Sequence, residues 1–251
     1  MIPNIKELAH RQLENYRAKT PGMCFSDPGF LIDVKTAYAL QDTVTNLRVD
    51  QGETIIGYKV GCTGPETTKQ FGMEGPIRGT LFSEEAHKTG AKLDILNFSN
   101  LAIEAEMAIE VDTRGKLVTI FPVIELHNFV FRGPKKSLPE LIGNNGINAG
   151  IVLPERHWRK PEKFYRNDSF ITLYINDKKI GYSSFWPNAE GPNTSLDWLK
   201  ANLKEYSLEL TAGQIILAGT PLGLYPVQNG DEIAVHIDNE VSVECSVHSD
   251  L

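Results

Sequence analysis

From Thr54 onward the sequence consists mostly of short runs rich in β-branched and aromatic residues, separated by glycine, proline, asparagine and aspartate. Such runs are typical of strands that end in tight turns. Helical patterns do not alternate with them, which argues against a doubly wound parallel sheet. The runs expected to form strands are 54–62, 78–82, 93–96, 103–111, 117–126, 170–175, 179–185, 214–218, 232–237 and 241–247, with one amphipathic helix at 195–206.

The first 52 residues have a different pattern. Apolar residues recur at helical spacing in 5–13 and again in 34–47, and Gly52 suits the end of the second helix. We therefore expect an α+β chain in which an N-terminal helical segment, 1–52, precedes a β-rich domain, 53–251, that forms a mixed-sheet roll or barrel and is a single structural unit.

Composition excludes several classes of protein. The 251 residues suffice for a large core. With 25 Lys and Arg against 32 Asp and Glu, the formal charge is −7, which does not favour nucleic acid as a partner. Three cysteines without a CxxC pair indicate reduced thiols in a cytoplasmic protein. No apolar run approaches the about 20 residues that cross a bilayer, so no membrane contact is expected.

The segment Ile103-Glu-Ala-Glu-Met-Ala-Ile-Glu-Val111 carries a pair of acidic residues at a spacing of two. Side chains at i and i+2 of a strand share one face, so Glu104 and Glu106 would project together. Neighbouring like charges in a sheet repel each other, and a divalent cation such as Mg²⁺, Mn²⁺ or Ca²⁺ would remove that cost. A solvated strand face is the other interpretation of this pair.

Glu125 lies within an otherwise apolar stretch, 121–126. A buried unpaired carboxylate is costly, so a partner is expected. If the two acidic strands form a hairpin about 113–116, Glu125 falls close to Glu104, and three carboxylates could share one ion. His127 would lie on the same face, either supporting the ligands from outside or packed as an ordinary histidine, and none of the histidines has a zinc-site spacing.

Two further segments offer polar groups next to glycines. Lys59, between Gly57 and Gly61, is either a snorkelling lysine, a cation that holds an anionic substrate, or a proton carrier with a lowered pKa. The flanking glycines would allow a ligand to approach the backbone. In the segment 218–223, backbone N–H groups and the Thr220 hydroxyl could meet a carboxylate, unless the segment is only a tight turn.

Several motifs occur in a fixed order and together resemble a known family. They are Ala37-Tyr-Ala-Leu-Gln41, Gly57-Tyr-Lys-Val-Gly-Cys-Thr63, Gln70-Phe-Gly72, Gly79-Thr-Leu-Phe82, Glu104-Ala-Glu106, Val123-Ile-Glu125, Gly191-Pro192 with Ser195-Leu196 and Trp198-Leu199, the stretch 210–219, and Pro226-Val-Gln-Asn-Gly-Asp231. This order resembles the fumarylacetoacetate hydrolase superfamily, and within it the 2-keto-4-pentenoate hydratase and 4-oxalocrotonate decarboxylase branch.

The resemblance implies a fold like the C-terminal domain of fumarylacetoacetase. It also implies a metal-dependent hydratase or decarboxylase, a lyase that acts on small 2-oxo acids through a metal-stabilised enolate, in the catabolism of aromatic compounds. Glu104, Glu106 and Glu125 would hold Mg²⁺ or Mn²⁺. Members of the family are commonly homo-oligomers, so we expect the same here.

The resemblance also implies roles around the substrate. Lys59 would act on it as the catalytic residue, and Lys59, Gly61, Arg78 and Thr220 would bind it. Between the proline and the glycine of the stretch Pro76-Ile-Arg-Gly79, the branch's hydratases carry an acidic residue, whereas this chain has none there and carries Arg78. It could grip a second carboxylate of a dicarboxylic substrate or be a surface cation.

Two other departures keep alternatives open. Gly219-Thr-Pro-Leu-Gly223 is more similar to the branch of C–C bond hydrolases, and the stretch between Glu106 and Glu125 is short, which predicts a hairpin where the family has an inserted helix. The alternatives are a C–C bond hydrolase or acylpyruvase, an oxaloacetate decarboxylase on the same scaffold, and a non-catalytic protein that binds 2-oxo acids.

Overall fold

The N-terminal part of the chain is helical. The computed structural model describes residues 4–63, 75–160, 164, 169–187 and 190–249. Helix α1 (Ile5–Arg17) packs against α2 (Val34–Asp50), which in turn contacts the short helix α4 (Leu138–Gly143). The boundary predicted at residue 52 lies between α2 and the first strand. No helix in the described ranges is both long and apolar enough to cross a membrane.

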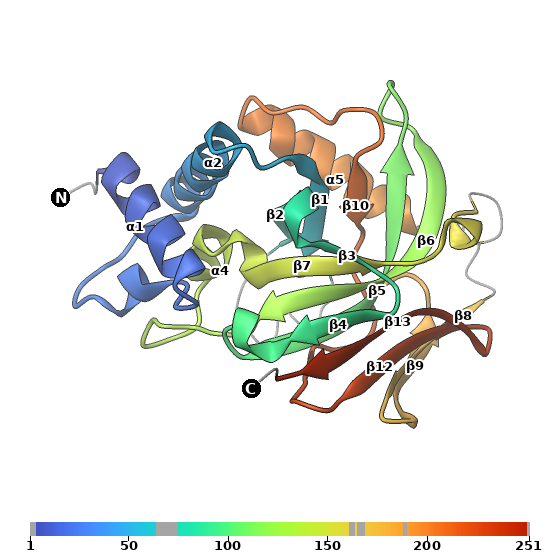
Figure 1. Ribbon diagram of the computed structural model, residues 1–251. Helices are drawn as coiled ribbons and strands as arrows, with labels where there is room; N and C mark the ends of the chain where they lie inside the picture. Colours follow the sequence, from blue (N-terminus) through green and yellow to red (C-terminus); the bar gives the residue numbers. More distant parts are fainter. Residues whose placement is uncertain (1–3, 64–74, 161–163, 165–168, 188–189, 250–251) are drawn as a thin grey trace.

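Most strands belong to one curled sheet. Its order is β2 (Ile77–Phe82), β1 (Ile55–Gly61), β10 (Ile215–Leu217), β5 (Leu101–Val111), β6 (Leu117–Asn128), β7 (Asn148–Leu153) and β3 (Ala86–Lys88), with β11 (Tyr225–Pro226) also paired to β5. Strands β2 and β7 contact each other although β1, β10, β5 and β6 separate them in this order. The sheet therefore curls into a half-barrel (Figure 1).

A second sheet packs on the outside of this half-barrel (Figure 1). It has the order β4 (Ala91–Asp94), β13 (Glu240–His248), β12 (Glu232–Ile237), β8 (Phe170–Ile175) and β9 (Lys178–Ser184), and β12 and β13 contact β6. The main apolar core lies between the sheets and includes the buried face of α5 (Pro192–Glu205). Short 3₁₀ turns occupy Met23–Ser26, Ser83–Glu85, Ile95–Asn97, Asn145–Ile147 and Arg156–Trp158.

The alternation of residues along β5 decides which side chains enter the curl. Ala105 and Met107 belong to the main core between the sheets, whereas Ala108 belongs to a separate apolar cluster on the other face. Because successive side chains of a strand point to opposite faces, Glu104 and Glu106 project with Ala108 into the curl. The acidic pair is thus on the concave face of the sheet, next to the apolar cluster that contains Ala108.

The expected α+β architecture with a β-rich roll is confirmed, and so is the acidic hairpin. Strands β5 and β6 are antiparallel and join through a turn at 112–116, and their register places Glu104 directly opposite Glu125. The expected strand 93–96 instead ends at Asp94, because a 3₁₀ turn follows it. The motif Gln70-Phe-Gly72 lies outside the described residues.

Three elements that complete the curl were not expected from the sequence: β3, β7 and α4. Strand β7 has the sequence Asn-Ala-Gly-Ile-Val-Leu, and both asparagine and glycine are rare in strands. Helix α4 has six residues, too few to show a periodic pattern. These elements depend on neighbouring strands and helices for their stability.

Gly57 allows β1 and β10 to pair. Its φ is +153°, and a Cβ there would lie 1.8 Å from the carbonyl oxygen of Ile215, its partner in β10. Gly213 also has a positive φ, +81°, but a Cβ there would meet nothing within 4 Å. We expect Gly57→Ala to lower the free energy of unfolding by about 3 kcal/mol or more, through strain and clash.

The matched variant Gly213→Ala bears only the conformational cost of a positive φ, about 1–2 kcal/mol. Urea denaturation of the two variants and the parent measures the difference. Equal losses in both variants would contradict the close approach of β1 to β10.

Candidate active site

A cavity of about 370 Å³ lies at the end of the curl where the charged side chains gather. Its polar wall comes from β1, β5 and β6 and from the segment after β10. Its apolar wall comes largely from the region of α4 and the segment after Pro221. The lining residues are Lys59, Gly61, Cys62, Thr63, Ile77, Glu104, Glu106, His127, Phe129, Leu141, Gly146, Ile147, Gly219, Thr220, Pro221, Leu222, Gly223 and Leu224.

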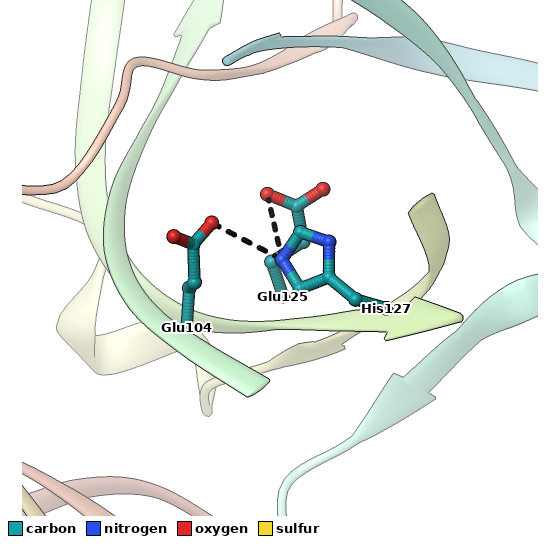
Figure 2. Close-up of side chains that lie close together, drawn as sticks. All are labelled: Glu104, Glu125 and His127. Atoms are coloured by element: carbon teal, nitrogen blue, oxygen red, sulfur yellow. Dashed lines mark ion pairs between the residues drawn. The ribbon is translucent and has the colours of Figure 1, made fainter. Parts of the chain in front are cut away.

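Glu104, Glu125 and His127 converge at this end of the sheet (Figure 2). The Nε2 atom of His127 lies 3.1 Å from Oε2 of Glu104 and 3.6 Å from Oε2 of Glu125. Glu125 is fully buried, as the apolar residues around it in the sequence suggested. One nitrogen and two carboxylate oxygens from paired strands therefore share one small volume.

Glu106 is buried beside this group. Burial raises its pKa, and the negative charges of Glu125 and Glu104 raise it further. The charge of Lys59 and a hydrogen bond from the Gly219 backbone N–H only partly offset these effects, so the pKa is well above its ordinary value. The Oε2 atoms of Glu106 and Glu125 have no hydrogen-bond partner among the described residues. Unpartnered buried acceptors are costly, so this cluster has room for a further positive group.

The donor set fits a divalent cation. One ligand atom from each of Glu104, Glu125 and His127 lies within 4.8 Å of the others. Carboxylate oxygens are the ligands that Mg²⁺, Mn²⁺ and Ca²⁺ prefer. When all three carboxyl groups are ionised, they and the ammonium of Lys59 leave two negative charges, which one divalent cation would balance.

Lys59 is a buried cation in this site. Its Nζ lies 3.0 Å from Oε1 of Glu125 and donates a hydrogen bond of 3.2 Å to the carbonyl of Gly146. Burial lowers the pKa of Lys59, but the charges of Glu125, Glu104 and Glu106 outweigh burial and raise it. The side chain is therefore charged and does not snorkel to solvent, and its pKa moves in the direction opposite to that of a neutral proton carrier.

The support for these groups comes from residues that the sequence did not single out. Asn148, on β7, donates from Nδ2 to Oε1 of Glu125 over 2.8 Å. The carbonyl that receives Lys59 belongs to a left-handed turn, Asn145–Ile147, with φ values of 57°, 62° and 56°. The Asn145 side chain holds this turn to both backbone groups of Thr80. The sequence alone could not predict the roles of Asn145 and Asn148, because their hydrogen-bond partners lie far away in the chain.

Gly61 and Thr220, both predicted to contact the substrate, line the cavity. A Cβ on Gly61 would lie 3.1 Å from Cε of Lys59, so glycine leaves room for the lysine side chain. The Thr220 hydroxyl donates to the carbonyl of Ala105 over 2.6 Å and accepts from the N–H of Leu222 over 3.0 Å. This hydroxyl therefore links the segment 218–223 to β5. Because it donates its proton to Ala105, it has no second proton to donate to a substrate.

Arg78, the remaining predicted substrate contact, is not among the residues that line the cavity. Its guanidinium donates to Gln41, Asp42 and Asn202 over 2.6, 2.8 and 2.9 Å and lies over the ring of Tyr38. The interpretation as a surface cation is wrong, because Arg78 is fully buried. Its charge joins α2, β2 and α5 behind the site.

We expect Arg78→Ala to lower the free energy of unfolding by about 3–5 kcal/mol, because Asp42 and Gln41 would lose a buried partner. The control is Arg156→Ala, since Arg156 is exposed and should contribute less than about 0.5 kcal/mol. Chemical denaturation measures both. A loss of substrate affinity with no loss of stability would contradict this structural role.

The motif resemblance is supported by similarity to characterised proteins. No family model matches the chain. It is 27% identical over 234 residues to a 2-oxo-hept-4-ene-1,7-dioate hydratase of Escherichia coli, covering 85% of this chain and 86% of that protein. It is 26% identical over 229 residues to a 2-keto-4-pentenoate hydratase of Burkholderia vietnamiensis, with the same coverage of 85% and 86%.

A solved structure shows the same fold. The 4-oxalocrotonate decarboxylase of Pseudomonas putida G7, complexed with magnesium and adipate, superimposes with a TM-score of 0.87 at 20% identity and covers 97% of each chain. The hydratases match along most of their sequence, and the decarboxylase matches along nearly the whole fold. The chain is thus similar in sequence to 2-keto-4-pentenoate hydratases and to a 4-oxalocrotonate decarboxylase, and it shares the fold of the decarboxylase.

Proposed function

We propose that this protein is a divalent-metal-dependent lyase that hydrates or decarboxylates small 2-oxo acids. The observation that carries the proposal is that half-buried Glu104 and buried Glu106 and Glu125 lie together beside a cavity, with unpartnered oxygens on Glu106 and Glu125. These three residues would hold the cation, Mg²⁺ or Mn²⁺. The names of the related hydratases and decarboxylase supply the reaction class.

A bound cation would supply Lewis acidity that stabilises negative charge developing on the 2-oxo oxygen. The chain's own residues supply the rest. The ammonium of Lys59 lies on the cavity wall, where it favours an anionic substrate and the charge that develops in the reaction. Apolar side chains, among them Ile77, Leu141 and Leu224, also line the cavity and would hold the carbon chain and exclude water.

C–C bond hydrolysis by an acylpyruvase is the second candidate, and oxaloacetate decarboxylation on the same scaffold is the third. The hydrolase reaction is favoured by Gly219-Thr-Pro-Leu-Gly223, which forms part of the cavity wall and is more similar to the hydrolase branch. Incubation of the protein with 2-hydroxydienoates, acylpyruvates and oxaloacetate in the presence of Mg²⁺ or Mn²⁺, with products followed by NMR, separates these reactions. Tight binding of 2-oxo acids without turnover would instead indicate a binding protein.

We expect Glu104→Gln and Glu125→Gln each to weaken Mn²⁺ binding by about tenfold or more and to abolish turnover, because each removes a charged ligand. The matched control is Glu110→Gln on the same strand, since Glu110 pairs with Arg159 over 3.0 Å at the far end of β5. Isothermal titration calorimetry measures binding. Unchanged affinity in both site variants would contradict the proposal.

Lys59→Met separates catalysis from metal binding. Removal of the ammonium frees Glu125 from a competing ion pair, so we expect metal affinity to rise, while turnover falls by about 10²-fold or more. Calorimetry with Mn²⁺ shows whether the variant retains a folded site. Turnover close to that of the parent would contradict a catalytic role for Lys59.

Three further expectations are part of the proposal: a cytoplasmic protein, a homo-oligomer, and a division into segments 1–52 and 53–251. The sparse cysteines without a CxxC pair support the first. The N-terminal helices α1 and α2 lie together on one side of the strands (Figure 1), and this grouping supports the division.

A further inference from the structure

We propose that His127 is itself a ligand of the cation, so that the site presents one nitrogen besides its carboxylates and prefers Mn²⁺, Co²⁺ or Zn²⁺ to Mg²⁺. This inference rests on the proposed metal site and specifies its chemistry. Without it, His127 would be a packed histidine or a hydrogen-bonding support of the three carboxylates.

The geometry favours direct ligation. Two neighbouring ligand atoms, each about 2.1 Å from an octahedral ion, lie about 3 Å apart. Nε2 of His127 lies 3.1 Å from one carboxylate oxygen of Glu104 and 3.6 Å from one of Glu125. The same nitrogen faces both oxygens (Figure 2), whereas a histidine that only supported a ligand would need to face a single carboxylate.

The polar groups that the imidazole faces among the described residues are the carboxylates of Glu104 and Glu125. His127 is 1% exposed, and neither ring nitrogen has a hydrogen-bond partner among the described residues. Its neighbour in β7, Asn148, directs its amide to Glu125 and to the backbone of Gly150 instead. Burial of an unpartnered polar ring is costly, and a cation at the shared position would satisfy one nitrogen.

The number of ligands is also consistent with the proposed substrates. Glu104, Glu125 and His127 offer three ligand atoms within 4.8 Å of one another, and Glu106 beside them would add a fourth, so an ion with octahedral geometry would keep about two positions. A 2-oxo acid can offer two oxygen atoms, one from its carboxylate and one from its 2-oxo group. Because imidazole suits transition metals and Zn²⁺ better than Mg²⁺, the histidine predicts a shift in metal preference.

The test uses the untagged full-length chain, stripped of metal and loaded with Mn²⁺. Electron spin echo envelope modulation detects a nitrogen bound to Mn²⁺. We expect a ¹⁴N modulation that is replaced by a ¹⁵N modulation when the chain is made with ¹⁵N-labelled histidine. This measurement needs no variant, and it distinguishes histidine from lysine and backbone nitrogen.

The second arm compares His127→Gln with His157→Gln, since His157 is exposed and outside the cavity. In His127→Gln we expect the modulation to disappear and the affinity for Co²⁺, measured by calorimetry, to fall by about 100-fold, but that for Mg²⁺ by less than about tenfold. In His157→Gln both should equal the parent.

Each outcome decides something different. Mn²⁺ binding without a histidine modulation, or an equal loss for Co²⁺ and Mg²⁺ in His127→Gln, would overturn ligation by His127 and leave the proposed carboxylate site intact. Failure of the parent chain to bind any of Mn²⁺, Co²⁺ or Mg²⁺ would overturn both this inference and the proposed function.

Discussion

The pairing of β5 with β6 brings two carboxylates face to face inside the protein, and the site is built around this pair. Glu104 is directly opposite Glu125, and Glu106 follows on the same face. Like charges in this arrangement destabilise a sheet, and burial increases the cost. The curl tolerates them because β1 brings the ammonium of Lys59 to within 3.0 Å of Glu125. A divalent cation would compensate the charge that the lysine leaves unbalanced.

Two buried cationic side chains on neighbouring strands, Lys59 and Arg78, have different surroundings. Lys59, on β1, faces the cavity and shares it with acidic groups that lack partners. Arg78, on β2, has its guanidinium occupied by side chains of α2 and α5. Only the first arrangement leaves charge available to a ligand. Arg78 links helix α2 to strand β2 and so stabilises the part of the fold that lies behind the site.

The sequence predicted the hairpin and the side on which its acids lie, because strand alternation and a short turn are local properties. It therefore placed Glu104, Glu106 and Glu125 near one another, and the motif order indicated the family. It did not predict β7 or the left-handed turn Asn145–Ile147. Their conformations depend on Thr80, Glu125 and Lys59, which are more than twenty residues away.

By itself, the sequence determined the strand-rich character, the acidic hairpin and the presence of a lysine between glycines. Tertiary structure decided which polar groups face the cavity. It turned Arg78 away from the cavity, fastened the Thr220 hydroxyl to β5, and left the His127 ring without a hydrogen-bond partner beside two carboxylates. The physical reason is that period and turn chemistry fix the face of a strand, whereas partners and burial arise only when the sheet curls and distant elements meet.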